Sequence, residues 1–230
     1  MATLKNQGID VDEDMVPDRD EAVKPGRKSA RRADRVREII LDVALECFSA
    51  HGFSGTSTRS IAKLAGVRHS LVNYHFETKD NLWIAMMVKA LGEYARRVDE
   101  ILDNDKSKNK AEKLKLYIEA YAKTAANTPQ LLRIITQQST QNSPRLEWLI
   151  ENHTRKHFDM LSDLICGAQK EGAVIDGRPE HIFYLIVGTI GIFFAVPREY
   201  AALTGKDPFS AAEMHQVIDF VTQVIFTKKK

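Results

Sequence analysis

The sequence has little of what most metalloenzymes and nucleotide-binding enzymes require. It contains only two cysteines in 230 residues, with no Cys-x-x-Cys pair, no G-x-S-x-G motif and no phosphate-binding glycine loop. His153 and His157 are four residues apart on a predicted helix, which suits two metal ligands, but no third ligand stands at a matching spacing. We therefore expect no enzyme activity, no cofactor and no metal site.

Long apolar runs are also scarce. The longest, Ile182 to Val196, has 15 residues, fewer than the ~20 that a helix needs to cross a bilayer. No apolar stretch follows Met1, so no signal peptide is predicted. We expect no membrane contact and a cytoplasmic location, where Cys47 and Cys166 remain buried free thiols.

Apolar residues recur at three- and four-residue spacing along most of the chain, and no alternating stretch predicts a strand. The fold class predicted is therefore all-α. The polar run Asp103 to Lys110 is the expected joint between domains. Besides Ile182 to Val196, the predicted helices run from about Asp34 to Gly52, Thr78 to Leu102, Ala111 to Asn127, Pro129 to Ser139, Pro144 to Gly172 and Ser210 to Thr227. Thr78 is the expected cap of the second of these.

Two short helices joined by a turn at Gly66 are predicted between Thr56 and Lys79, with Thr56 or Ser57 as the first cap. Such a pair occurs as inert packing, and it also occurs with its second helix in a DNA major groove. The predicted apolar faces are Ile61, Ala62, Leu64 and Ala65, then Val67, Leu71, Val72 and Phe76. The second helix keeps a polar outer face of Arg68, His69, Ser70, Asn73 and Tyr74.

Three segments in fixed order, RVREIILDVALECFSAHGF, TSTRSIAKLAGV and LVNYHFETKDNL, resemble the N-terminal domain of the TetR family of bacterial transcriptional regulators. The resemblance extends over about residues 34 to 82, and the rest of the chain matches only in length and helical layout. Its motifs are R-x-I-A from Arg59 to Ala62, A-G-V from Ala65 to Val67, Y-H-F from Tyr74 to Phe76, and Lys79 before Leu82.

The resemblance implies a set of DNA-contacting residues. These are Thr58, Arg59, His69, Ser70, Asn73, Tyr74, His75 and Lys79. The sequence departs from the family at Arg68, where Ser often caps the recognition helix, and at Asn73, where Tyr often contacts a phosphate. On this basis Tyr74 and Lys79 are expected to bind phosphates, and Arg59 and His69 to discriminate bases, with Asn73 as a further candidate.

Charge is distributed unevenly in a way that suits DNA binding. Between Lys24 and Leu82 eleven Lys and Arg stand against six Asp and Glu, a net charge of +5, and the remaining residues carry −3. Residues 1–33 lack a sustained apolar period and are predicted to be a disordered arm. The basic run within this arm, KPGRKSARR, is either a solvated tail or a DNA contact.

The resemblance further implies a homodimer that binds a palindromic operator in double-stranded DNA and a small-molecule effector. The domains expected are residues 34–82 for DNA and residues 83–230 for the effector and dimerisation. The dimer seam is predicted in Ile182 to Val196 and Ser210 to Thr227, with Gly188 and Gly191 allowing close approach. Candidate pocket residues are Trp83, Met86, Tyr117, Tyr121 and Trp148.

The function expected is a ligand-responsive transcriptional regulator, a repressor that the small molecule releases from DNA. One alternative is an architectural or nonspecific DNA-binding protein without a ligand. A third class is an enzyme that uses the helical domain as its active site.

Overall fold

The computed structural model of the chain describes residues 27–103 and 109–227, and its elements there are helices apart from one isolated bridge between Val174 and Phe226. The chain divides into two units, Met1–Arg35 and Val36–Lys230, and the packing described below lies within the second. No strand is formed in the described ranges. The predicted all-α fold class is confirmed.

Helix α1 (Arg27–His51) begins earlier than the sequence predicted. We expected a start near Asp34 and a disordered arm up to residue 33, whereas residues 27–33 are helical and residues 1–26 lie outside the described part. Arg, Lys and Ala dominate this extension, and all three are strong helix formers. The helix ends as predicted before Gly52, whose φ is +67° and whose N–H donates to the Phe48 carbonyl at 2.9 Å.

Helices α2 (Thr58–Leu64) and α3 (His69–Phe76) form the expected pair. The side chain of Ser57 caps α2 by accepting the Ser60 N–H at 3.0 Å, and the Ser60 side chain accepts the Ser57 N–H in return. Gly66 makes the turn with a left-handed φ of +66°. The local chemistry that was read from the sequence therefore builds the helix pair.

Two residues of the predicted apolar faces do not enter the core. Leu64 is 67% exposed and Leu71 is 38% exposed. Helices of about two turns bury only one narrow stripe each, so a second apolar residue per turn is left outside. The fully enclosed members of the predicted faces are Ile61, Ala62, Val72 and Phe76.

Helix α4 (Lys79–Asp103) starts at its predicted cap, where the Thr78 hydroxyl accepts the Asn81 N–H at 3.0 Å. Asp80 lies in the first turn, where the helix dipole favours an anion. Most of the joint predicted after this helix lies outside the described residues. The helix buries Leu82, Trp83, Met86, Met87, Ala90, Leu91, Tyr94 and Val98.

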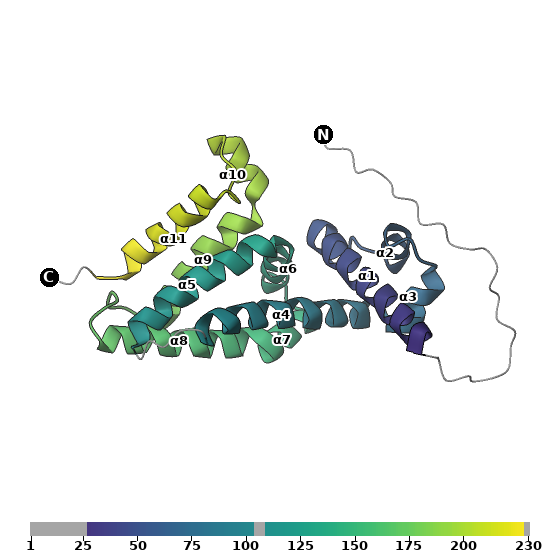
Figure 1. Ribbon diagram of the computed structural model, residues 1–230, viewed down its shortest axis with the longest axis horizontal. Coiled ribbons are helices and arrows are strands. Elements are labelled where there is room, and N and C mark those ends of the chain that lie inside the picture. The colour runs from purple at the N-terminus through teal and green to yellow at the C-terminus, as the bar shows by residue number, and fades with distance from the viewer. Residues whose placement is uncertain (1–26, 104–108, 228–230) are drawn as a thin grey trace, which may run out of the picture. The chain divides into compact units, whose positions relative to one another are not determined.

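Helices α5 (Lys110–Asn127) and α6 (Pro129–Ser139) follow their predicted ranges closely. The Asn109 side chain caps α5 by accepting the Glu112 N–H at 2.7 Å, and Pro129 occupies the first turn of α6. In Figure 1, α5 runs beside α4 and α8, and it also packs against α9 and α11. Its apolar side chains therefore form much of the core of this helical domain.

The prediction of one continuous α-helix from Pro144 to Gly172 is wrong for the middle of this segment. Helix α7 (Pro144–Leu149) passes into a π-helix, η1 (Ile150–Thr154), before α8 (Arg155–Lys170) continues. A π turn accommodates an extra residue and rotates the side chains that follow it, which the spacing of apolar residues does not reveal. Short π segments of this kind are frequent at functional sites.

The C-terminal part contains α9 (Pro179–Ala195), α10 (Pro197–Thr204) and α11 (Ala211–Ile225). Helix α10 was not predicted, because none of its residues is buried and it carries no apolar stripe to signal it. It ends at Gly205, which has a left-handed φ of +71°. Ser210, the predicted start of the last helix, caps α11, and its side chain accepts the Glu213 N–H.

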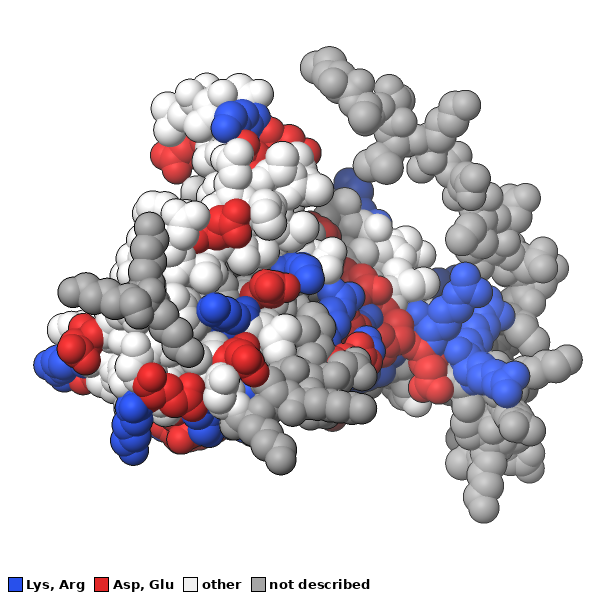
Figure 2. All heavy atoms as spheres, turned by 60° about the vertical axis from the view of Figure 1, so that its left-hand side comes forward, with Lys and Arg blue, Asp and Glu red and all other residues white. Residues whose placement is uncertain are grey.

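The two glycines of the predicted dimer seam differ in their surroundings. A Cβ at Gly191 would lie 3.1 Å from the Tyr121 hydroxyl, so this glycine allows close packing within the chain, and its role at a seam stays a prediction. Gly188 has no heavy atom within 4 Å of its Cβ position. Figure 2 shows basic and acidic side chains interspersed over one face of the molecule, with uncharged surface between them. Exposed apolar residues on α9 and α11 are Tyr184, Ile192, Phe220 and Val224.

No described helix is by itself both long and apolar enough to cross a membrane. Helices α9 and α10 reach that length and composition only as a pair, which is bent by 78° at its break. Both cysteines are free thiols as predicted, although Cys166 is half-buried where Cys47 is buried.

Candidate functional site

Helix α3 presents a polar face to solvent. Arg68, Ser70 and Asn73 are exposed, and Tyr74 is 79% exposed. Between residues 53 and 79 the chain carries four Lys and Arg and a single Glu. Hydroxyl, amide and cationic groups on one helix surface can donate to both phosphates and base edges.

Two of the predicted DNA-contacting residues are bonded to each other. The Thr58 hydroxyl lies 3.0 Å from Nε2 of His69, which joins the first residue of α2 to the first residue of α3. Thr58 and His69 are half-buried, whereas the neighbouring Arg59 is exposed. The bond fixes the relative position of the two helices, so His69 has one ring nitrogen already in use.

Leu71 belongs to the same face and was missed because it was assigned to the core. It is three residues after Arg68 and three before Tyr74, a spacing that places all three side chains on one side of a helix. This periodicity was the signal that sequence reasoning overlooked. An exposed apolar side chain there is suited to contact a thymine methyl group. His75 is half-buried, with its ring centroid 5.3 Å from that of Tyr74.

Lys79 has a role that the sequence did not predict. Its ammonium group donates hydrogen bonds of 2.8 Å to the carbonyl oxygens of Phe53 and Thr56, and it lies 4.2 Å from the centre of the Phe53 ring. Thr56 is held from its other side, where its hydroxyl donates to the carbonyl of Gly52 at 2.8 Å. Lys79 thus fastens the loop between α1 and α2 and keeps one N–H for another partner.

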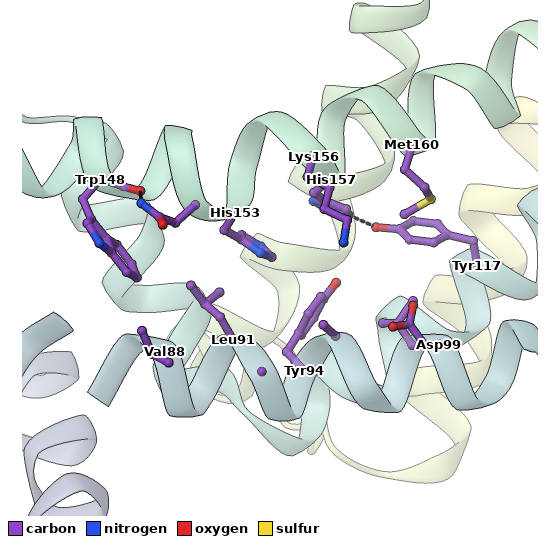
Figure 3. A pocket seen from close by; sticks show the side chains of 14 residues that line it. Val88, Leu91, Tyr94, Asp99, Tyr117, Trp148, His153, Lys156, His157 and Met160 are labelled. Carbon is purple, nitrogen blue, oxygen red and sulfur yellow. Dashed lines mark hydrogen bonds between the residues drawn. The ribbon is translucent and has the colours of Figure 1, made fainter. Parts of the chain in front are cut away.

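A cleft of about 360 Å³ lies between α4, α5 and the continuous run of α7, η1 and α8. This volume is near the lower end of the range found for small-molecule sites. Figure 3 shows side chains from α4 facing those from α8 across it. The lining residues are Val88, Leu91, Gly92, Tyr94, Ala95, Val98, Asp99, Tyr117, Trp148, Asn152, His153, Lys156, His157 and Met160.

The predicted pocket candidates divide into two groups. Tyr117 and Trp148 line the cleft, but Trp83, Met86 and Tyr121 do not. Trp83 and Met86 are fully buried, because they lie on the side of α4 that faces the core. Tyr121 lies one helical turn beyond Tyr117 and stacks on it with ring centroids 5.9 Å apart.

Sequence reasoning missed the two histidines and one tyrosine that form the inner wall. His153 in η1 and His157 in α8 stack at 5.6 Å, and the ring of Tyr94 meets them edge-on from α4. The Tyr117 hydroxyl is hydrogen-bonded to Nε2 of His157. Their four-residue spacing was a usable signal, although it was tested only for metal binding. Within the described ranges no group of three metal-ligating side chains is formed.

The inner wall is uncharged at neutral pH. Burial lowers the pKa of His157 to about 4, with a smaller contribution from the adjacent His153, whose own pKa burial also lowers. Burial also raises the pKa of Tyr94 and Tyr117 well above the ordinary tyrosine value. The cleft therefore offers neutral hydrogen-bonding groups within an otherwise apolar and aromatic surface.

Residues 40–86 match the family model for bacterial regulatory proteins of the tetR family. Over 204 residues the chain is 26% identical to the HTH-type transcriptional regulator RutR of Escherichia coli (strain K12), a match that covers 89% of this chain and 95% of that protein. It is 23% identical over 152 residues to the fatty acid metabolism regulator protein of Bacillus subtilis (strain 168), which covers 66% and 77% of the two chains.

Solved structures resemble the fold over most of the chain. The ketosteroid transcriptional regulator KstR2 of Mycobacterium tuberculosis superposes with a TM-score of 0.69 at 20% identity, covering 84% of this chain and 95% of that chain. AibR, in complex with isovaleryl coenzyme A and operator DNA, superposes with a TM-score of 0.68 at 16% identity and covers 83% and 98%. At these identities the likeness establishes the fold, an N-terminal helix-turn-helix unit followed by a larger helical domain.

Proposed function

Because this chain is a member of the tetR family of bacterial regulatory proteins, we propose that it is a transcriptional regulator that binds a DNA operator and responds to a small molecule. In this proposal the protein is a repressor that binds a palindromic operator as a homodimer and dissociates from it when the small molecule binds. It acts in the cytoplasm, catalyses no reaction and needs no cofactor.

The main support for this proposal is helix α4, because it contributes residues to both candidate sites, the helix pair α2–α3 and the cleft. Its first residue, Lys79, bonds to the loop before α2, and further along it lines the cleft with Val88, Leu91 and Tyr94. Since α3 ends at Phe76, a shift of α4 would be transmitted directly to the recognition helix. A ligand would produce that shift only by binding the shifted state more tightly.

Residues 34–82 are proposed as the DNA-binding domain and residues 83–230 as the effector-binding and dimerisation domain. The basic residues that precede residue 34 are proposed to bind DNA phosphates. The arm supplies affinity without sequence preference in this scheme, and the helix pair supplies specificity.

The DNA contacts are proposed to divide by chemistry. Tyr74 and the remaining N–H of Lys79 would bind phosphates, whereas Arg59, His69 and Asn73 would discriminate bases. The exposure of Arg59, Asn73 and Tyr74 supports this division. Further contacts are proposed for Thr58, Ser70 and His75.

The homodimer is proposed to form through α9 and α11. These helices pack against each other and leave large apolar side chains on the surface, among them Tyr184, which is 67% exposed, and Phe220, which is 59% exposed. A second copy of the same surface would cover them. Two recognition helices related by a twofold axis would then read half-sites ~34–36 Å apart or a multiple of that distance.

Footprinting on the intergenic DNA beside the gene tests the proposal. The purified protein should protect an inverted repeat, and Arg59→Ala should reduce the ratio of affinities for that repeat and for scrambled DNA. Arg155→Ala, at an exposed position on α8, is the matched control and should leave the ratio unchanged. Equal protection of the repeat and scrambled DNA would instead favour an architectural or nonspecific DNA-binding protein.

A further inference from the structure

The Tyr94 hydroxyl is a buried polar group without a hydrogen-bond partner in the described part of the chain. Tyr94 is only 5% exposed and lines the cleft. Figure 3 shows its hydroxyl directed from α4 toward the space below His157 and Tyr117. The Tyr117 hydroxyl lies close enough to contribute to the raised pKa of Tyr94, but the two hydroxyls do not meet with hydrogen-bond geometry, and Tyr117 is bonded to His157. The O–H of Tyr94 can therefore bond to a group that enters the cleft. Such an unsatisfied donor is unusual in a folded protein and calls for a partner.

Gly92 leaves room on the same helix. It lines the cleft in the middle of α4, and a Cβ added there would meet no heavy atom within 4 Å. Glycine weakens a helix interior relative to alanine, so packing within the chain gives no reason for it here. A flat molecule can therefore lie close against the backbone of α4 at this point.

The walls of the cleft favour rings. Trp148 closes one end, Leu91 and Met160 supply apolar surface, and the His153 ring faces Tyr94 edge-on at 5.9 Å. Aromatic side chains of this kind pack well on the faces and edges of other rings. A planar ring would contact more of this surface than a flexible chain and would lose less conformational freedom on binding.

The charges around the cleft do not favour an ion. Its inner wall is neutral because the tyrosines stay protonated and the histidines stay unprotonated. The two formal charges, Asp99 and Lys156, are both exposed, lie at its edge and have opposite signs. An ionised ligand group would lose its hydration at the inner wall without gaining a counter-charge there.

We propose that the cleft binds an uncharged planar ring compound that presents a carbonyl oxygen to the Tyr94 hydroxyl, an aryl ketone being the simplest example. The proposal rests on the proposed function in so far as this molecule would be the effector. Its test uses the protein without DNA. If the protein binds the probe but no operator, the proposed function fails and this inference holds. If it binds an operator but not the probe, the proposed function holds and this inference fails.

The test is a titration of the full-length protein at pH 7.5 with four probes, followed by tryptophan fluorescence. The chain has two tryptophans. Trp148 lines the cleft, and the ring centroid of Trp83 lies 5.8 Å from that of Trp148. Acetophenone is the probe expected to bind. Ethylbenzene lacks the carbonyl, 2-octanone has the same number of carbons without the ring, and benzoate is a charged counterpart.

Acetophenone should bind saturably and at least fivefold more tightly than ethylbenzene or 2-octanone, and benzoate should bind at least tenfold more weakly. Tyr94→Phe should weaken acetophenone binding roughly 2- to 10-fold, the value of one neutral hydrogen bond, and leave ethylbenzene unchanged. Gly92→Leu should abolish binding of all ring probes. Arg96→Leu, on the same helix outside the cleft, is its control and should bind like the parent.

Three results would overturn the proposal. The first is no saturable signal with acetophenone at ~5 mM, a concentration at which even a binding energy of about 4 kcal/mol would be visible. The second is tighter binding of benzoate that Lys156→Gln removes, which would assign the cleft to anions. The third is a Tyr94→Phe variant that binds acetophenone and ethylbenzene in the same ratio as the parent.

Discussion

The guanidinium carbon of Arg145 lies 3.6 Å from the centre of the Phe53 ring. The same side chain pairs with Asp80 at 3.0 Å and donates to the Gln138 side chain at 3.2 Å. The start of α7 is thereby joined to the loop between α1 and α2 and to the first turn of α4. Trp148, one helical turn after Arg145, lines the cleft. A ligand that displaces Trp148 would therefore act on a contact with the proposed DNA-binding domain.

Arg145→Leu should lower the free energy of unfolding by about 1–2 kcal/mol, because it removes a cation–π contact and a partly exposed ion pair. Urea denaturation followed by circular dichroism measures this loss. Arg155→Leu, an exposed position on α8, should change the same quantity by no more than about 0.5 kcal/mol. Equal effects of the two substitutions would show that the Phe53 contact contributes nothing to stability.

Lys79→Gln should lower stability and also weaken DNA binding. The loss of two charge-assisted hydrogen bonds to loop carbonyls should cost about 1–3 kcal/mol in unfolding free energy, since the group is half-buried. If its remaining N–H binds a phosphate, the slope of log affinity against log salt should fall by about one. A destabilised variant with an unchanged slope would restrict Lys79 to its structural role.

The predictable parts of this fold are those with local signals. Pro129 in the first turn of α6, Ser210 as the cap of α11 and Gly52 after α1 each act on backbone within a few residues. The chemistry that starts or stops a helix is therefore present in the sequence itself. For the same reason the cap of α4 at Thr78 was predicted correctly.

The remainder depends on contacts between distant segments. Lys79 bonds to a carbonyl 26 residues earlier, and the Tyr94 ring meets His157 from a different helix. Helical spacing states which residues share a face, but not which helix covers that face. The π-helix η1 also rotates the residues after it, so the positions of His153 and His157 relative to Tyr94 followed only from the structure.

Acid should destabilise the protein through His157. Its pKa is about 4 in the folded protein and 6.5 ordinarily, so the unfolded chain binds more protons between these values. The free energy of unfolding should thus fall as pH drops from about 6.5 to about 4, by roughly 2–3 kcal/mol. Chemical denaturation at a series of pH values measures this fall, and His157→Asn should make the curve flatter.

The control for that experiment is His181→Asn, because His181 is exposed. Its pH profile should follow that of the parent. A parent profile that is flat between pH 6.5 and 4, or a His157→Asn profile as steep as the parent's, would assign any acid lability to other groups such as His153, whose pKa burial also lowers.

Charged substitutions on α9 and α11 should separate the proposed homodimer. Tyr184→Glu and Phe220→Glu each place a carboxylate on an apolar surface that a second copy would cover, and burying an unpaired charge is too costly for the interface to persist. Sedimentation velocity should show a dimer for the parent at micromolar concentration and a monomer for either variant. Leu203→Glu, on α10 and 80% exposed, provides a control of the same chemistry and should remain dimeric.

Operator affinity should fall roughly 100-fold or more in the monomeric variants, because a single recognition helix loses the second half-site and its effective concentration. A parent that sediments as a monomer, or a Leu203→Glu variant that dissociates while Tyr184→Glu does not, would place the interface elsewhere.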